Sequence, residues 1–372
     1  MIRRWLGSLY GRAPRADAPI APSAFSLNLL ARHNPGLASH FRWSTNPMPA
    51  APGPLYLHLG CGERVLDGFV NLDFLPHDGR VTAWNLLDLW PDVLAGRVEG
   101  VFSEDVLEHF FHAEQVYILC NVNRALRPGA VARTLMPSLA RLVDYSADYV
   151  PKPEEFLHST FGVETGGDAL NIGLRFSGHR WLHNPQSLGR MAELCGFDVV
   201  PTSCAASTVE RFNGLNLRDE SNSLSFASDL RKVSPISRTL LTPQAVSGAQ
   251  WVEDAGDGAQ LYVATVARPS VDYVVPQPMD SRAIACINVR SSNLSSFSEH
   301  SLKTLVIDDA NRERPWFFDE TLKSRPCMNI VTRSQVRLIL GDATTMSKLS
   351  FSPAAHAGEY FTLGCAEIFV LG

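Results

Sequence analysis

Three features are scarce or missing in this chain, and each absence excludes a class of protein. Its 372 residues contain no apolar run of the roughly 20 residues that a membrane-spanning helix needs, so we expect no transmembrane segment. The net charge of −5 lacks the basic excess of a general nucleic-acid binder. The 7 cysteines show no CxxC spacing, which predicts reduced core thiols in a cytoplasmic protein and neither a disulfide framework nor a zinc site.

The first 50 residues predict a partly flexible extension. Proline recurs throughout residues 13–54, which favours a lead-in over a packed domain. Arg3 and Arg4 are not followed by the apolar stretch of an export signal. The apolar side chains of residues 2–9 can share one face of a short basic helix, so peripheral contact with an anionic membrane stays open beside the favoured interpretation, a frayed tail.

Residues 55–62, LYLHLGCG, organise the first half of the chain. A short and mostly apolar run ends abruptly at Gly60, which is typical of a buried parallel strand. Glycine adopts positive φ readily and lets a ligand approach main-chain N–H groups, because no Cβ lies in the way. The turn therefore suggests a nucleotide-type ligand, a hypothesis that later residues must support.

Strands and helices alternate over residues 51–233. After the first strand, the patterns predict strands at 69–72, 81–86, 100–102, 130–136, 197–200 and 224–227, and helices at 113–126 and 185–195. Asn184 is a favourable N-cap for the second helix and Gly196 closes it. The alternation predicts an α/β domain with a doubly wound, mostly parallel sheet that binds ligands at the carboxyl ends of its strands.

Four ordered motifs carry a resemblance to a known family. They are LHLGCGERVLDGFVNLDFLP at 57–76, SEDVLEHF at 103–110, NRALRPGA at 123–130 and HRWLHNPQSLGRMAELCGF at 179–197. Together they resemble class I S-adenosylmethionine-dependent methyltransferases, and more narrowly a group of small bacterial methyltransferases often associated with surface-polysaccharide loci. The resemblance covers residues 55–233 and is not specific for substrate.

The resemblance implies S-adenosylmethionine as cofactor and a binding site at the strand ends. Its predicted residues are Gly60, Cys61, Gly62, Asp73, Asp88 and Glu104. The glycine turn would lie against the methionine part, Asp73 would accept the ribose hydroxyls and Asp88 the adenine amino group. The alternatives are a turn role for Asp73 before Pro76 and a helix N-cap for Asp88.

The SEDVLEHF motif supplies the candidate catalytic residues. Asp105, Glu108 and His109 stand at i, i+3 and i+4, so a helical start places them on one face at the mouth of the sheet. His109 can act as a general base on a substrate hydroxyl. The alternative is that Glu108 bridges within the fold while His109 packs under the sheet.

A metal ion at this motif is a separate question. Its spacing resembles the metal-ligand motif of some ubiquinone-pathway and small-RNA 2′-O-methyltransferases. No further ligand can be placed from the sequence, so we predict no metal. The stretch with His158, His179, Arg180, Trp181 and His183 is expected to cover the acceptor side, as contacts for a sugar or as a packed lid.

The last third of the chain has an all-β pattern. We expect a connecting β segment at 234–275 and a smaller β-sandwich at 276–372, with short strands at 260–266, 283–289, 305–307, 328–331, 336–340, 349–351 and 367–371. INVRSSNLSSF, VIDD followed by RPWFF, and QVRLILGDATTMSKLSF faintly resemble a discoidin-like, galactose-binding jelly roll. The chain ends sooner than that family would, so the domain is abridged or the resemblance is false. Trp316, Phe317 and Phe318 fit a glycan site or a core.

The motifs favour an enzyme that O-methylates a sugar, glycan or glycolipid precursor by in-line transfer, where proximity supplies most of the rate. A non-catalytic glycan-binding protein on a degenerate methyltransferase fold is the alternative, because Ala130 and Ser138 depart from the family pattern. A nicotinamide-dependent oxidoreductase fits the glycine turn but not the crossing at 63–68, which is too short for a helix.

Overall fold

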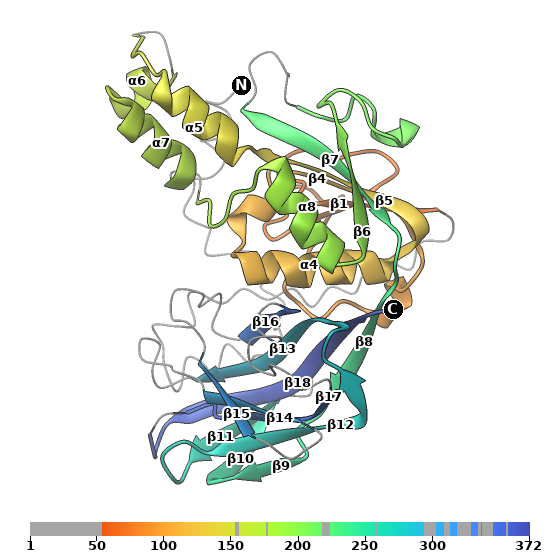
Figure 1. Cartoon of the computed structure of the whole chain (residues 1–372), viewed down its shortest axis with the longest axis vertical. Coiled ribbons are helices and arrows are strands. Elements are labelled where there is room, and N and C mark those ends of the chain that lie inside the picture. The colour runs from red at the N-terminus through yellow and green to blue at the C-terminus, as the bar shows by residue number, and fades with distance from the viewer. Residues whose placement is uncertain are drawn as a thin grey trace.

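The computed structural model shows an α/β part, formed by the first half of the chain, above a β-sandwich formed by the second half (Figure 1). It describes residues 54–152, 156–175, 178–217, 224–256, 259–293, 303–308, 313–317, 329–333, 336, 345–354 and 356–372. The predicted extension at 1–50 lies outside these residues. No helix in the described ranges is both long and apolar enough to cross a membrane.

The α/β part is built on one large sheet with strand order β3-β2-β1-β4-β5-β7-β6. Its strands are β1 (Leu55–Leu59), β2 (Val70–Asp73), β3 (Val81–Ala83), β4 (Val98–Glu104), β5 (Leu126–Pro137), β6 (Phe197–Thr202) and β7 (Ser225–Lys232). The pairs from β3 to β5 are parallel, whereas β7 runs antiparallel to both β5 and β6. The mostly parallel sheet predicted from the alternation is confirmed.

The strand boundaries follow local side-chain chemistry. β1 has the predicted bounds, and β4 is longer than predicted. β3 ends at Ala83, short of the predicted 81–86, and an Asx turn explains why: the side-chain oxygen of Asn85 accepts a hydrogen bond from the Leu87 N–H at 3.0 Å. The chain therefore leaves the sheet before reaching Asp88.

The two helices predicted from periodicity are present. They are α4 (His112–Ala125) and α8 (Pro185–Leu194). Asn184 caps α8 as predicted, because its side chain accepts from the Ser187 N–H at 2.8 Å while the Ser187 hydroxyl accepts from the Asn184 N–H at 3.0 Å. Gly196 follows with a φ of 78°, the left-handed conformation expected after a helix end.

The two faces of the sheet are covered differently, which corrects the doubly wound prediction. α4 and α8 share a core with Leu55, Leu57 and Leu59 on one face. Among the described residues, the other face is covered by the segment 203–217, in which the short turn η3 (Glu210–Phe212) buries Phe212. The crossing from β1 to β2 is too short to supply a helix on that side, as the sequence predicted.

Three short helices that the sequence did not predict lie between β5 and α8. They are α5 (Leu139–Ala147), α6 (Phe156–Phe161) and α7 (Gly166–Arg175). They project from the carboxyl edge of the sheet (Figure 1). α5 and α7 pack closely because residue 173 is a glycine. A Cβ at this position would lie 2.9 Å from a Leu142 methyl group.

The second half forms two antiparallel sheets with a shared apolar core. One sheet has the order β10-β11-β18-β13-β16 with β8 beside β18, and the other has the order β15-β14-β17-β12-β9. The strands are β8 (Ile236–Leu241), β9 (Ala245–Ser247), β10 (Ala249–Gly256), β11 (Ala259–Ala264), β12 (Ser270–Asp280), β13 (Ile284–Asn293), β14 (Lys303–Asp308), β15 (Glu313–Phe317), β16 (Asn329–Thr332), β17 (Thr345–Phe351) and β18 (Tyr360–Leu371).

Three strands that fall largely in the expected connecting segment, β8, β11 and β12, pair with strands of the expected sandwich, and β9 and β10 pair with β12 and β11. They are thus integral to the two sheets. The predicted strand at 336–340 lies, apart from residue 336, outside the described residues. So do Phe318 and the side chains of Trp316 and Phe317.

α4 lies between the large sheet and the β-sandwich (Figure 1). Its residues 113–125 are all buried, and Phe369 and Cys286 of the sandwich belong to the same apolar core. Asn123, which interrupts the apolar stripe, is tolerated in this buried helix because its amide donates to the carbonyls of Cys195 and Ser234.

A buried ion-pair network joins the two halves. Glu367 on β18 is fully buried and accepts hydrogen bonds from Tyr117 on α4 and from Arg238 and Arg290 on the neighbouring strands. Each arginine also donates to a backbone carbonyl of the loop 87–92, Arg290 to residue 87 and Arg238 to residue 90. The sandwich therefore fixes the loop that carries Asp88.

His58 makes the stability of the α/β part depend on pH. Burial lowers its pKa from 6.5 to about 4, against the effect of its 3.0 Å hydrogen bond to the side-chain oxygen of Asn71. Because the folded pKa lies below the unfolded one, this stability is fully present above pH 6.5 and is lost as the pH falls towards 4.

We expect the wild type to lose about 3 kcal/mol more unfolding free energy than His58→Gln between pH 7 and pH 4. Urea denaturation at both pH values measures this difference, and His77→Gln in an exposed loop is the control. An identical pH dependence in wild type and His58→Gln would contradict the assignment.

Candidate functional site

The turn after β1 has the shape of a ligand cradle. Gly60 and Gly62 have φ values of 58° and 53°, which glycine adopts without strain. A Cβ on Gly60 would lie 2.5 Å from a methyl group of Val106, whereas a Cβ on Gly62 would meet nothing within 4 Å. Gly60 thus packs directly against Val106, whereas the space beside Gly62 is open.

Asp73 lies beside this turn, as predicted. Its carboxylate accepts hydrogen bonds from the N–H of Gly62 at 2.8 Å and from the N–H of Leu75 at 2.9 Å, one on each oxygen. The second contact is an Asx turn, so the alternative role also holds. Each oxygen keeps a further lone pair, and the half-buried carboxylate can accept additional donors.

Cys61 is held in the turn by its backbone. Its N–H donates to the carbonyl of Leu72 at 3.0 Å, which ties the end of β1 to the end of β2. Burial, reinforced by the charge of Asp73, raises the pKa of the Cys61 thiol to about 12. Cys61 is therefore protonated at neutral pH and does not serve as a nucleophile.

The other two predicted cofactor residues lie on different elements. Asp88 sits on the loop held by the sandwich and does not cap a helix, since the next helical turn, η1 (Asp92–Leu94), begins after Pro91. The Glu104 carboxylate, at the end of β4, accepts the Leu217 N–H at 3.0 Å and lies 3.5 Å from the Arg64 guanidinium. Glu104 thus connects the glycine turn with the segment 203–217.

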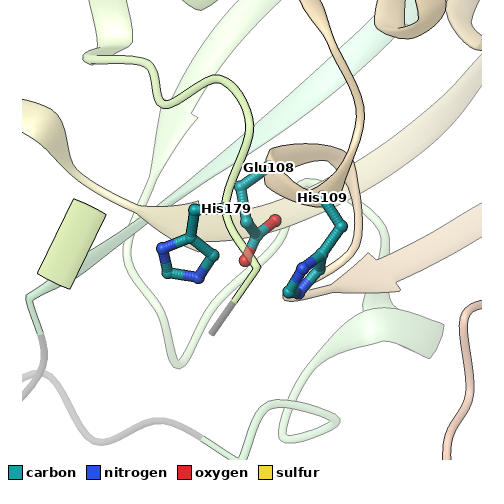
Figure 2. A group of neighbouring side chains, drawn as sticks. All are labelled: Glu108, His109 and His179. Atoms are coloured by element: carbon teal, nitrogen blue, oxygen red, sulfur yellow. The ribbon is translucent and has the colours of Figure 1, made fainter. Parts of the chain in front are cut away.

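The residues that lie together in the structure differ from the predicted catalytic residues Asp105, Glu108 and His109. Asp105 has a φ of 55° and precedes the 3₁₀ turn η2 (Leu107–His109), so it does not share a helical face with Glu108. Instead, ligand atoms of Glu108, His109 and His179 all lie within 4.8 Å of one another (Figure 2). This geometry could hold a metal ion.

His179 lies in the cluster because hydrogen bonds hold its segment against η2. The Glu108 carbonyl accepts the backbone N–H groups of Arg180 at 2.7 Å and of Trp181 at 3.3 Å. The side-chain amide of Gln115 donates to the carbonyls of Leu107 and Trp181 at 2.7 and 3.0 Å. The sequence placed His179 on the acceptor side but gave no signal that it meets a motif 70 residues earlier.

The remaining histidines of the acceptor-side stretch have structural contacts. His183 is buried and lies 2.7 Å from the side-chain oxygen of Gln115, and burial lowers its pKa to about 4. His158 lies 2.9 Å from the Val163 carbonyl. Trp181, by contrast, is 43% exposed and its ring lies 5.1 Å from that of His112, so it presents an aromatic face to solvent.

His109 is a weaker general base than the sequence implied. Burial, together with the charge of the neighbouring His179, lowers its pKa to about 4, against an opposing effect of Asp105. A base works best when its pKa lies near the operating pH. The neutral imidazole is better suited to accept a hydrogen bond or to bind a metal.

Comparing Gly60→Ala with Gly62→Ala separates the cost of backbone strain from the cost of a side-chain clash. Both changes place alanine in the left-handed region, which we expect to lower the unfolding free energy by about 1–2 kcal/mol. Only Gly60→Ala also drives a Cβ into Val106, which we expect to cost about 1–3 kcal/mol more. Urea denaturation gives both values, and equal losses would show that Val106 does not limit the turn.

Comparisons with known proteins do not assign a family. No family model and no curated protein matches the chain. Among solved structures, it is similar to a chain of a complex between a Haloferax volcanii methyltransferase activator and the protein described as its methyltransferase (12% identity, 55% of this chain and 95% of that chain, TM-score 0.30).

Two further solved structures are similar to parts of the chain. One is a carbon methyltransferase (14% identity, 50% of each chain, TM-score 0.28), and the other is a xylan-binding module from Roseburia intestinalis (8% identity, 37% of this chain and 96% of that chain, TM-score 0.26). All three TM-scores lie below 0.5, so we base no inference about fold or function on these similarities.

Proposed function

We propose that this protein is an S-adenosylmethionine-dependent methyltransferase. The observation that carries the proposal is the Asp73 carboxylate, held 2.8 Å from the N–H of Gly62 at the carboxyl edge of two parallel strands. A carboxylate in this position suits a ligand that combines ribose hydroxyls with a group lying against the glycine turn. The motif resemblance names that ligand as S-adenosylmethionine.

The sheet order supports a methyltransferase over a nicotinamide-dependent oxidoreductase. Dinucleotide-binding folds have the order 3-2-1-4-5-6. This sheet has one additional strand, β7, inserted antiparallel between β5 and β6. The inserted strand and the short crossing after β1 both depart from the dinucleotide-binding fold.

The residues present fit the cofactor. The open space over Gly62 leaves room for a ligand against the backbone, and Asp73 keeps acceptor capacity for hydroxyl groups. Asp88, on the loop anchored by Arg290, would meet the adenine, and Glu104 would lie at the edge of the site. When bound, S-adenosylmethionine supplies an electrophilic methyl group on a positive sulfur.

The chain's own contribution is to position an acceptor hydroxyl and to exclude water. Glu108, His109 and His179 offer oxygen and nitrogen atoms that can accept a hydrogen bond from a hydroxyl. The exposed face of Trp181 is suited to stacking on a sugar ring. We therefore propose O-methylation of a sugar, glycan or glycolipid precursor, with alignment supplying most of the rate.

Calorimetric titration with S-adenosylmethionine and S-adenosylhomocysteine tests the cofactor. We expect binding by the full-length protein and a loss of about 100-fold or more in affinity for Asp73→Ala, because two hydrogen bonds to a charged group disappear. Asp78→Ala is the matched control, since this nearby exposed carboxylate pairs with Arg80. Equal affinity in Asp73→Ala and wild type, or no binding by folded protein, would reject the proposal.

A non-catalytic glycan-binding role is the second candidate. Trp251 on β10 is 53% exposed and lies across from Tyr262 on β11, so the two rings share one face of a sheet. Aromatic faces of this kind can bind sugar rings. Folded protein that binds xylan or cellulose oligosaccharides but neither adenosyl compound would favour this role.

A further inference from the structure

We infer that Glu108, His109 and His179 form a binding site for a divalent transition-metal ion. Metal–ligand distances of about 2.0–2.2 Å place ligand atoms about 3 to 4.3 Å apart around one ion. The three candidate atoms lie within 4.8 Å of one another, so a small rotation of the side chains brings them into range. Figure 2 shows the Glu108 carboxylate between the two imidazole rings.

The imidazole of His179 is oriented for coordination. Its Nδ1 lies 2.8 Å from the Gly173 carbonyl, which can only accept, so Nδ1 carries the hydrogen. In the neutral ring this leaves the Nε2 lone pair as the ligand atom. A metal-bound histidine usually donates its other N–H to a carbonyl or carboxylate in this way, which fixes its tautomer and ring orientation.

The backbone holds the third ligand in place. Residues 180 and 181 each donate a backbone N–H to the main-chain carbonyl of Glu108, whose side chain is one of the three proposed ligands. His109 also forms a hydrogen bond with the backbone of Gly178, in the same segment as His179. The two parts of the site are thus fastened together next to the ligand atoms, which is the preorganisation that a metal site needs.

The donor set selects the class of ion. Two imidazole nitrogens and one carboxylate suit Zn²⁺, Fe²⁺, Mn²⁺ or Co²⁺, whereas Mg²⁺ and Ca²⁺ prefer oxygen ligands throughout. Three protein ligands leave coordination positions open, as in catalytic sites and unlike closed structural sites. An acceptor hydroxyl is a suitable additional ligand; this role rests on the proposed function, but metal binding itself does not.

This proposal departs from the sequence-based prediction of no metal. Glu108 and His109 offer only two neighbouring ligands, and the third comes from a segment that the chain brings back after the helices α5 to α7. Asp105 is not part of the proposed site, because its left-handed backbone separates it from η2.

Metal titration of chelator-treated, full-length protein tests the site without any adenosyl compound. We expect one Zn²⁺ or Co²⁺ per chain by calorimetry, and Co²⁺ absorption bands typical of nitrogen and oxygen ligands. His179→Ala should weaken binding by about 100-fold or more, since the loss of even an outer-shell partner commonly costs 10- to 100-fold. His158→Ala is the matched control, because His158 contacts the Val163 carbonyl outside the cluster.

A second measurement keeps the proposal testable if His179→Ala fails to fold. Crystals of the wild type soaked in Mn²⁺ or Zn²⁺ should show an anomalous peak between Glu108 and the two imidazoles. Absence of that peak together with no stoichiometric binding in solution overturns the site, as does unchanged affinity in folded His179→Ala. Metal binding without adenosyl binding would retain the site while rejecting the methyltransferase.

Discussion

The end of β1 constrains the whole α/β part. Gly60 packs against Val106 with no room for a side chain, and Gly62, two residues later, donates its N–H to Asp73. One tight turn therefore joins the ends of β1 and β2 to the segment that leads into η2. The proposed cofactor cradle and the Glu108 cluster are built on the same turn, so neither can move far without the other.

Burial of α4 is the second constraint. The helix fills the space between the large sheet and the sandwich, and Glu367, at the centre of the ion-pair network beside it, is fully buried. Removing one partner from such a network leaves a buried charge, which typically costs about 3–5 kcal/mol. The network also holds the loop 87–92, so the sandwich acts as a support for one wall of the proposed cofactor site.

The sequence patterns correctly predicted the features that depend on residues close together in the chain. The apolar run at 55–59 and the Asn184 cap gave the bounds of β1 and the start of α8, because each depends on neighbours in sequence. The antiparallel β7, the segment 203–217 over one sheet face, and the meeting of His179 with Glu108 depend on contacts between distant residues, which periodicity does not encode. Asp105 was misplaced because its left-handed backbone breaks the helical spacing assumed for the motif.

Hydrogen–deuterium exchange of the full-length protein with and without S-adenosylhomocysteine tests the central claim most directly. A cofactor in the proposed cradle would slow exchange at residues 60–64 and 73–75, where backbone N–H groups line the turn, and would leave β10 and β11 unchanged. Slowed exchange confined to other segments, or no change at saturating ligand, would contradict the account.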